Sequence, residues 1–179
     1  EGNTSCYVTV FEDDGLFRMY YRGSSYDLEN RKSGDQRVCY AVSVDGIHWT
    51  KPELGLFEFE GSTANNILWE GDAVHNFSPF KDANPDCPPD ERYKAVASGP
   101  DRAKLLAFKS ADAIHWELMQ EEPIITEGRF DSHNVAFWDT YRERYVEFHR
   151  DVADGARAIM TATTDDFLNW PDPVWLEYT

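Results

Sequence analysis

The sequence predicts an all-β protein built from repeated antiparallel units, and three observations support this. Apolar residues do not recur at helical spacing; short apolar runs are instead separated by turn-forming Asp and Gly residues. One frame of residues occurs three times along the chain. Aromatic residues make up 15 % and hydrophobic residues 41 % of the 179 residues, which is enough apolar surface for a packed core.

The repeat is defined by residues at matched positions. Each copy begins with a Glu-Gly pair, at Glu1, Glu70 and Glu127. A Phe follows each Glu, then an Asp two positions later, and a Ser/Thr-x-Asp-x-x-x-Trp element closes the copy. The matched residues are Phe11, Phe80 and Phe137; Asp13, Asp82 and Asp139; and, in the closing elements, Asp45 with Trp49, Asp112 with Trp116, and Asp166 with Trp170. In that element we expect the Asp to bond backbone N–H groups and the Trp to pack in the core.

Each copy reads as four short strands. We expect them at residues 7–11, 16–21, 38–44 and 54–59; 77–80, 92–98, 105–110 and 123–126; and 135–138, 145–149, 158–164 and 174–178. Four-stranded antiparallel units of this length, stacked radially, are the blades of a β-propeller. The sequence therefore predicts one partial propeller over residues 1–179, with blades of about 1–69, 70–126 and 127–179. A β-sandwich is the alternative, but it does not predict a repeated Asp and Trp.

Three blades are fewer than the four to eight of a typical closed ring. We expect the ring to be completed by a longer chain or by another chain. An open ring would leave apolar flanks at residues 7–11 and 174–178, so self-association through the open blade faces is predicted.

Charge and cysteine content exclude several classes of function. The net charge of −16 argues against nucleic acid or an anionic membrane as a partner, because both need a basic face. No apolar run of about 18 residues is present to span a membrane. Cys6, Cys39 and Cys87 have neither zinc nor disulfide spacing, and we expect Cys6 and Cys39 to be small core residues.

Residues peculiar to one copy are better functional candidates than residues that every copy repeats. In the third copy, polar residues stand just ahead of the apolar run 135–138 and along the return strand. Such groups at the mouth of a buried strand are costly unless they are paired or used. We expect Asp131 and His133 on one face of the strand, because they are two residues apart. The candidates are Asp131, His133, Asn134, Glu147, His149 and Arg150, with Asp72, His75 and Asn76 at the second strand mouth.

Structural interpretations of the same residues stay open. His133 can be a hydrogen-bonded structural histidine, and Asp131 can cap a turn with Ser132. For Glu147 we favour pairing with Arg150 or Arg144. No residues have metal-ligand spacing and no cofactor is expected, although a channel cation held by His and carboxylate oxygens remains open.

Two motifs carry a resemblance to a known superfamily. The element Ser43-x-Asp45-Gly46-x-x-Trp49 and the stretch RFDSHNVAFWD, residues 129–139, resemble the five-bladed propeller glycoside hydrolases of families 32 and 43. The second stretch is similar to the Arg-Asp-Pro strand of the invertase-like family, which also runs into Phe-Trp-Asp. His133 stands where that pattern has its Asp, and Asp131 lies two residues earlier. The Trp-x-Asn-Asp-Pro nucleophile motif and the Glu-Cys acid motif are absent.

The resemblance implies a five-bladed ring and a glycoside hydrolase-like protein that acts on or binds plant or microbial oligo- or polysaccharides in a central channel. It implies Asp131 as a catalytic or sugar-binding carboxylate and Glu147 as a second choice. The implied substrate-binding residues are Asp72, His75, Asn76, His133, Asn134 and Arg150. It also favours a secreted or periplasmic location. The alternative is a non-catalytic propeller that binds carbohydrate or another protein.

Overall fold

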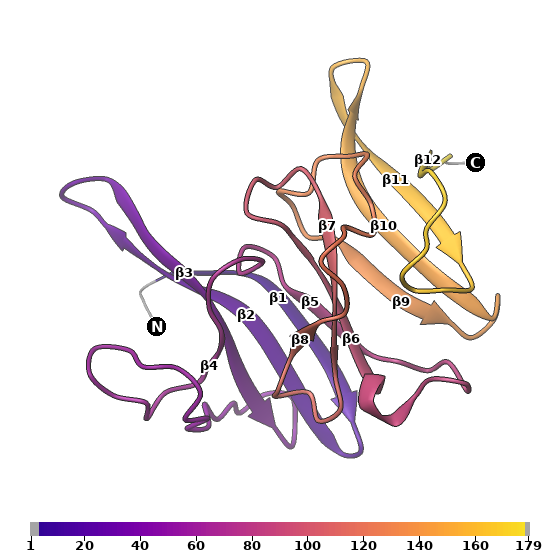
Figure 1. The fold of residues 1–179 in the computed structure, drawn as a ribbon. Coiled ribbons are helices and arrows are strands. Elements are labelled where there is room, and N and C mark those ends of the chain that lie inside the picture. Colours follow the sequence, from indigo (N-terminus) through magenta and orange to yellow (C-terminus); the bar gives the residue numbers. More distant parts are fainter. Residues whose placement is uncertain (1–3, 178–179) are drawn as a thin grey trace. The chain divides into compact units, whose positions relative to one another are not determined.

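A computed structural model describes residues 4–177, and it confirms an all-β chain of three four-stranded antiparallel sheets (Figure 1). The first sheet contains β1 (Thr4–Asp13), β2 (Leu16–Asp27), β3 (Lys32–Ser43) and β4 (Ile67–Trp69). The second contains β5 (Ser78–Lys81), β6 (Tyr93–Ser98), β7 (Leu105–Ser110) and β8 (Glu117–Leu118). The third contains β9 (Val135–Asp139), β10 (Arg144–Ala153), β11 (Ala156–Thr164) and β12 (Val174–Trp175). A short 3₁₀ helix, η1 (Pro89–Glu91), precedes β6.

The chain divides into two compact units. Unit 1 spans Glu1–Phe77 and holds the first sheet, and unit 2 spans Ser78–Thr179 and holds the second and third sheets. Glu1 and Gly2, which head the first repeat, and Tyr178, at the end of the expected last strand, lie outside the described residues.

In unit 1 the expected fourth strand at 54–59 is wrong. The strand that pairs with β3 is β4, thirteen residues further along, and its residues Ile67 and Leu68 are buried. Gly55, at a φ of +72°, interrupts the extended backbone of the expected strand. The N–H of Leu54 then donates to the carbonyl of Asn65, so this segment folds back as a loop. The expectation for Cys6 is also wrong, because Cys6 is exposed while Cys39 is buried.

Unit 2 has an apolar core shared by its two sheets. All six residues of β6 are buried, as expected for a strand covered on both faces. Core residues from both sheets and from the connecting segments pack together: Val96, Leu105, Ile125, Phe130, Ala136, Tyr145 and Phe167. The expected strand at 123–126 is reduced to one bridge between Ile125 and Leu105, and β8 takes the fourth position instead.

The repeated Asp turns have the expected scaffold geometry. Asp112 Oδ1 accepts hydrogen bonds from the backbone N–H groups of Ile114 and His115, at 2.9 and 2.8 Å. Asp45 makes the same two bonds in the first copy, and Asp166 bonds the N–H of Leu168 in the third. Trp116 is buried and its Nε1–H donates to the carbonyl of Ala113. The element therefore forms the turn that follows β3, β7 and β11.

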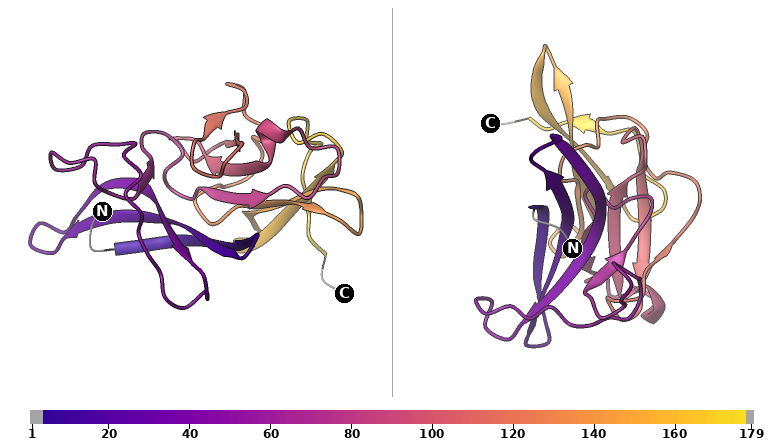
Figure 2. Two further views of the ribbon diagram at one scale, coloured as in Figure 1. Left: turned by 90° about the horizontal axis from the view of Figure 1, so that it is seen from below. Right: turned by 90° about the vertical axis from the view of Figure 1, so that its left-hand side faces the viewer.

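The β10–β11 hairpin overhangs β9, and the outer strands β1 and β12 have exposed apolar side chains. The β10–β11 hairpin extends beyond β9, because β9 pairs with β10 only as far as Val135–Phe148 (Figures 1 and 2). Val8 and Val10 on β1 and Val174 and Trp175 on β12 are exposed, and self-association through these flanks stays a prediction. No helix within residues 4–177 is long and apolar enough to cross a membrane.

Candidate functional site

Asp131 lies in a loop, and the expectation that it shares a strand face with His133 is wrong. β9 begins only at Val135, and residues 131 and 132 form a bend ahead of it. Two residues before Asp131, Arg129 forms a β-bridge with Arg150 on the overhanging end of β10. The backbone N–H of Arg129 donates to the Arg150 carbonyl oxygen, with an N–O distance of 2.9 Å. This bridge brings Asp131 to the Arg150 side chain, and the two form an ion pair.

The ion pair is asymmetric in exposure. The side chain of Asp131 is 46 % exposed, whereas that of Arg150 is 12 % exposed. Partial burial favours the neutral acid, but the hydrogen bond and charge of Arg150 outweigh it and lower the pKa of Asp131 below its usual value. Asp131 is therefore an ionised carboxylate that remains open to solvent and fixed in place by its partner.

His133 and Asn134 connect this loop to its surroundings. His133 Nε2 lies 3.2 Å from Ser78 Oγ, at the start of β5. Burial lowers the pKa of His133, so its imidazole is neutral near pH 7 and can donate at one nitrogen and accept at the other. Asn134 is fully buried, and its side-chain amide donates to the carbonyl of Phe130. This hydrogen bond holds the loop that precedes β9.

Glu147 does not pair with Arg150 or Arg144, so that expectation is wrong. Its Oε2 lies 2.9 Å from His149 Nδ1, and both side chains are fully buried. The reason is the period of a strand: residues 147 and 149 share a face, whereas residue 150 points to the other side. Arg144 lies 3.3 Å from Asp165 instead. Burial raises the pKa of Glu147 against the opposing effect of His149.

The candidates near the second strand mouth belong to unit 1. Asp72 is exposed, and its backbone carbonyl accepts a hydrogen bond from Trp69 Nε1 at 2.7 Å. His75 Nδ1 lies 2.9 Å from an Arg22 nitrogen and 3.0 Å from Gln36 Oε1. Asn76 is fully buried. The role of these three residues in substrate binding stays a prediction.

A second polar cluster, at the other end of the unit 2 sheets, was not among the candidates. Lys94 Nζ lies 2.6 Å from Asp82 Oδ2, and the Tyr145 hydroxyl donates to the same oxygen at 2.7 Å. Burial lowers the pKa of Lys94, but Asp82 outweighs it and raises that pKa above the lysine value. Burial, aided by Asp82, raises the pKa of Tyr145 to about 12.

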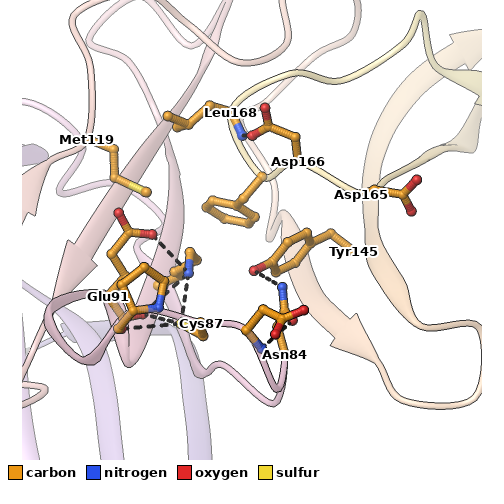
Figure 3. Close-up of a pocket in the computed structure, with 12 residues that line it drawn as sticks. Asn84, Cys87, Glu91, Met119, Tyr145, Asp165, Asp166 and Leu168 are labelled. Atoms are coloured by element: carbon orange, nitrogen blue, oxygen red, sulfur yellow. Dashed lines mark hydrogen bonds and ion pairs between the residues drawn. The ribbon is translucent and has the colours of Figure 1, made fainter.

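This cluster borders a cavity of about 290 Å³, shown in Figure 3. Cys87 Sγ lies 3.2 Å from Lys94 Nζ at its wall, and burial raises the pKa of the Cys87 thiol. A lysine inside the apolar run 92–98 was the one sequence signal for the cluster. Its Asp belongs to the repeat. Asp13 pairs with Arg18, which lies opposite Phe11 as Lys94 lies opposite Phe80, and Asp139 pairs with Arg142 in its own turn. The cluster therefore has the character of scaffold.

Over the part of the chain that the structure describes, no group of three or more His, Cys, Asp or Glu side chains is arranged to hold a metal ion.

Comparison with known proteins places this geometry in a fold. No protein-family model matches the sequence, and no curated protein matches it. Solved structures do match. A glycosyl hydrolase from Bacteroides ovatus aligns with 94 % of this chain at 18 % identity and a TM-score of 0.58, over 50 % of its own length.

Two further structures agree. One comes from work on the GH130 family of mannoside phosphorylases, which contains glycoside hydrolases that target β-1,2 mannosidic linkages in Candida mannan. It aligns with 96 % of this chain at 16 % identity and a TM-score of 0.54, over 49 % of its length. The other is a fructofuranosidase from Schwanniomyces occidentalis, aligned with 93 % of this chain at 15 % identity and a TM-score of 0.56, over 32 % of its length. This chain spans about half the length of the first two. It has, over that span, the β-propeller fold of these glycoside hydrolases.

Proposed function

We propose that this chain is part of a glycoside hydrolase-like protein that binds an oligo- or polysaccharide, with Asp131 as the carboxylate that meets the sugar. The observation that carries the proposal is that Arg150 keeps Asp131 ionised and fixed while nearly half of its side chain stays exposed. A fixed carboxylate can accept hydrogen bonds from two adjacent sugar hydroxyls. The neutral His133, a short distance along the same loop, can donate or accept as a hydroxyl requires.

The ionisation of Asp131 limits its chemical role. Glycoside hydrolysis needs one ionised carboxylate and one carboxylic acid kept protonated by its surroundings. The lowered pKa of Asp131 suits a nucleophile, a base or an orienting group, and does not suit the acid. Glu147 has the raised pKa that an acid needs, but it is buried against His149. We therefore assign the sugar contact to Asp131 and not to Glu147.

The second candidate function is carbohydrate binding without cleavage. It is favoured by one observation: in the Asp131 cluster of unit 2, the other predicted carboxylate, Glu147, has no exposed atoms. A hydrolase needs a second accessible carboxylate, about 5 to 10 Å from the first. Such a group can come from the half of the matched structure that this chain does not cover.

The test is calorimetric titration with three probes: a β-1,2-linked manno-oligosaccharide, a fructo-oligosaccharide and an arabino-oligosaccharide. We expect one of them to bind, and we expect Asp131→Asn to weaken that binding tenfold or more, because a hydrogen bond to a charged group contributes about 1.5 to 3 kcal/mol. Asp165→Asn is the matched control, since Asp165 forms an exposed pair with Arg144 on the same sheet. Release of reducing sugar from the bound probe distinguishes hydrolysis from binding alone.

Two results would contradict the proposal. The first is a wild-type chain that binds none of the probes. The second is an Asp131→Asn variant with a lower melting temperature and unchanged binding, which would make Asp131 a turn cap.

A further inference from the structure

The loop that carries Asp131 rests on the buried pair Glu147 and His149. Both side chains project from β10 to the same side and neither is exposed. The 2.9 Å contact between His149 Nδ1 and Glu147 Oε2 fixes the plane of the imidazole ring. With Nδ1 held by the carboxylate, the opposite edge of the ring, at Nε2, is turned toward the loop backbone at Gly128.

The loop is packed so closely on this ring that only glycine fits at residue 128. Gly128 has a φ of +135°, and a Cβ placed there would clash with His149 Nε2 and Cδ2. Phe130, two residues later, is fully buried, with its ring centroid 4.8 Å from that of His149. The imidazole therefore sets the distance between the loop backbone and β10.

The distance between the loop and β10 determines where Asp131 lies. The loop runs antiparallel to the part of β10 that extends past the last β9 pair, and Arg129 bonds the backbone of Arg150 there. The side-chain amide of Asn134 holds the carbonyl of Phe130 from the other side of the loop. Asp131 follows at once and reaches the Arg150 guanidinium. A loop displaced from β10 by the width of a methyl group would separate the Asp131 carboxylate from Arg150.

We propose that Glu147 and His149 are positioning residues for Asp131. Their buried pair supports residues 128–131 at the distance from β10 at which the Asp131 carboxylate meets Arg150. This inference rests on the proposed function only for its consequence, that sugar affinity depends on the Glu147–His149 pair. The placement of Asp131 can be measured without any sugar, because the Arg150 pair leaves its mark on the titration of the carboxylate.

The experiment measures the pKa of the Asp131 carboxyl by ¹³C NMR in the full 179-residue chain. In the wild type we expect a value below the ordinary one for Asp, about 3.9. In Gly128→Ala and in His149→Ala we expect it to rise toward that ordinary value, with sugar binding weakened tenfold or more. Gly155→Ala is the matched control: Gly155 also has a positive φ, +78°, but nothing lies near the added Cβ. It should leave the Asp131 pKa unchanged.

Glu147 variants separate positioning from simple stability. Glu147→Gln keeps an oxygen that accepts from Nδ1–H, so the Asp131 pKa should stay low; Glu147→Leu removes it, and the pKa should rise. If His149→Ala does not fold, the Gly128 and Gly155 pair still decides. An Asp131 pKa that stays low in Gly128→Ala overturns the positioning role, whatever the sugar does. A pKa that rises as expected, in a chain that binds no probe, supports the positioning role and sinks the proposed function.

Discussion

Two of the acid–base pairs in unit 2, Asp82–Lys94 and Asp131–Arg150, lie at opposite ends of its sheets and differ in burial and in repetition. Asp82 and Lys94 have side chains only 0 % and 2 % exposed, and the pair has a counterpart in Asp13–Arg18 of the first copy. The Asp131–Arg150 pair is partly open, and the positions that match Asp131 in the other copies are Ser5 and Val74. The first pair belongs to the frame of the repeat. The second belongs to one copy alone.

The difference teaches how a repeat fold separates stability from function. A fully desolvated pair cannot lose one member without leaving a buried charge. A partly hydrated pair contributes little to stability and can exchange water for a ligand. If this comparison is right, the cost of mutation should fall in order from the buried repeated pair, to repeated but exposed contacts, to the exposed pair of the candidate site.

The largest effect is expected for Lys94→Met. The substitution leaves Asp82 charged, buried and without its ammonium partner, and should lower the free energy of unfolding by about 3 to 5 kcal/mol. Urea denaturation followed by tryptophan fluorescence measures it. The double variant Asp82→Leu, Lys94→Met removes both charges and should recover at least half of the loss. A single variant that loses less than about 1 kcal/mol would show that burial does not make this pair a scaffold element.

An intermediate effect is expected for Asp112→Ala, which removes a repeated but exposed turn. The loss of its bonds to two backbone amides should cost about 1 kcal/mol at pH 7. Burial raises the pKa of Asp112, but the His115 side chain and the backbone bonds outweigh it and lower the pKa to about 2. The folded pKa is thus below the unfolded one, so this stabilisation is present above about pH 4 and is lost as the pH falls toward 2. Melting temperatures measured at pH 7 and near pH 2 should show that the difference between variant and wild type is smaller in acid.

The smallest effect on stability is expected for Asp131→Asn. The carboxylate is half-exposed, so its pair with Arg150 should contribute no more than about 1 kcal/mol to folding. The same urea titration measures it. A loss comparable to that of Lys94→Met would place Asp131 among the scaffold residues, and the comparison between the two ends of unit 2 would fail.

The sequence predicted the sheets better than their edges. The strand expected at 105–110 is β7 residue for residue, and all three sheets were expected. The failures are fourth strands, at 54–59 and 123–126. An apolar alternation such as LGLFEF satisfies the pattern of a strand, but pairing depends on which segment reaches β3, and that is decided by the turn at Gly55 and by the bonds of Asn65. Edge strands of two or three residues carry too little pattern to be recognised.

For the candidate site, subtraction of the repeat gave both Asp131 and Arg150 as candidates, but it did not predict that they pair. The bridge between Arg129 and Arg150 depends on how a loop meets an overhanging strand, and no residue spacing shows that. The Glu147–His149 pair could have been predicted, because residues two apart on a strand share a face. The pairing of Asp82 with Lys94 could not, since it depends on two strands meeting in register across η1.

The strand order of the three sheets has a consequence for how the chain is made. Within each sheet the strands are neighbours in the order of the sequence, so each sheet is completed before the next one begins. Contacts between sequence neighbours close short loops, which is fast, and a chain that emerges from the ribosome N-terminus first can settle one sheet at a time. A translational pause between Trp69 and Ser78 would leave a finished first sheet, whereas a pause inside the β2–β3 hairpin would leave an unpaired, partly apolar edge exposed to aggregation.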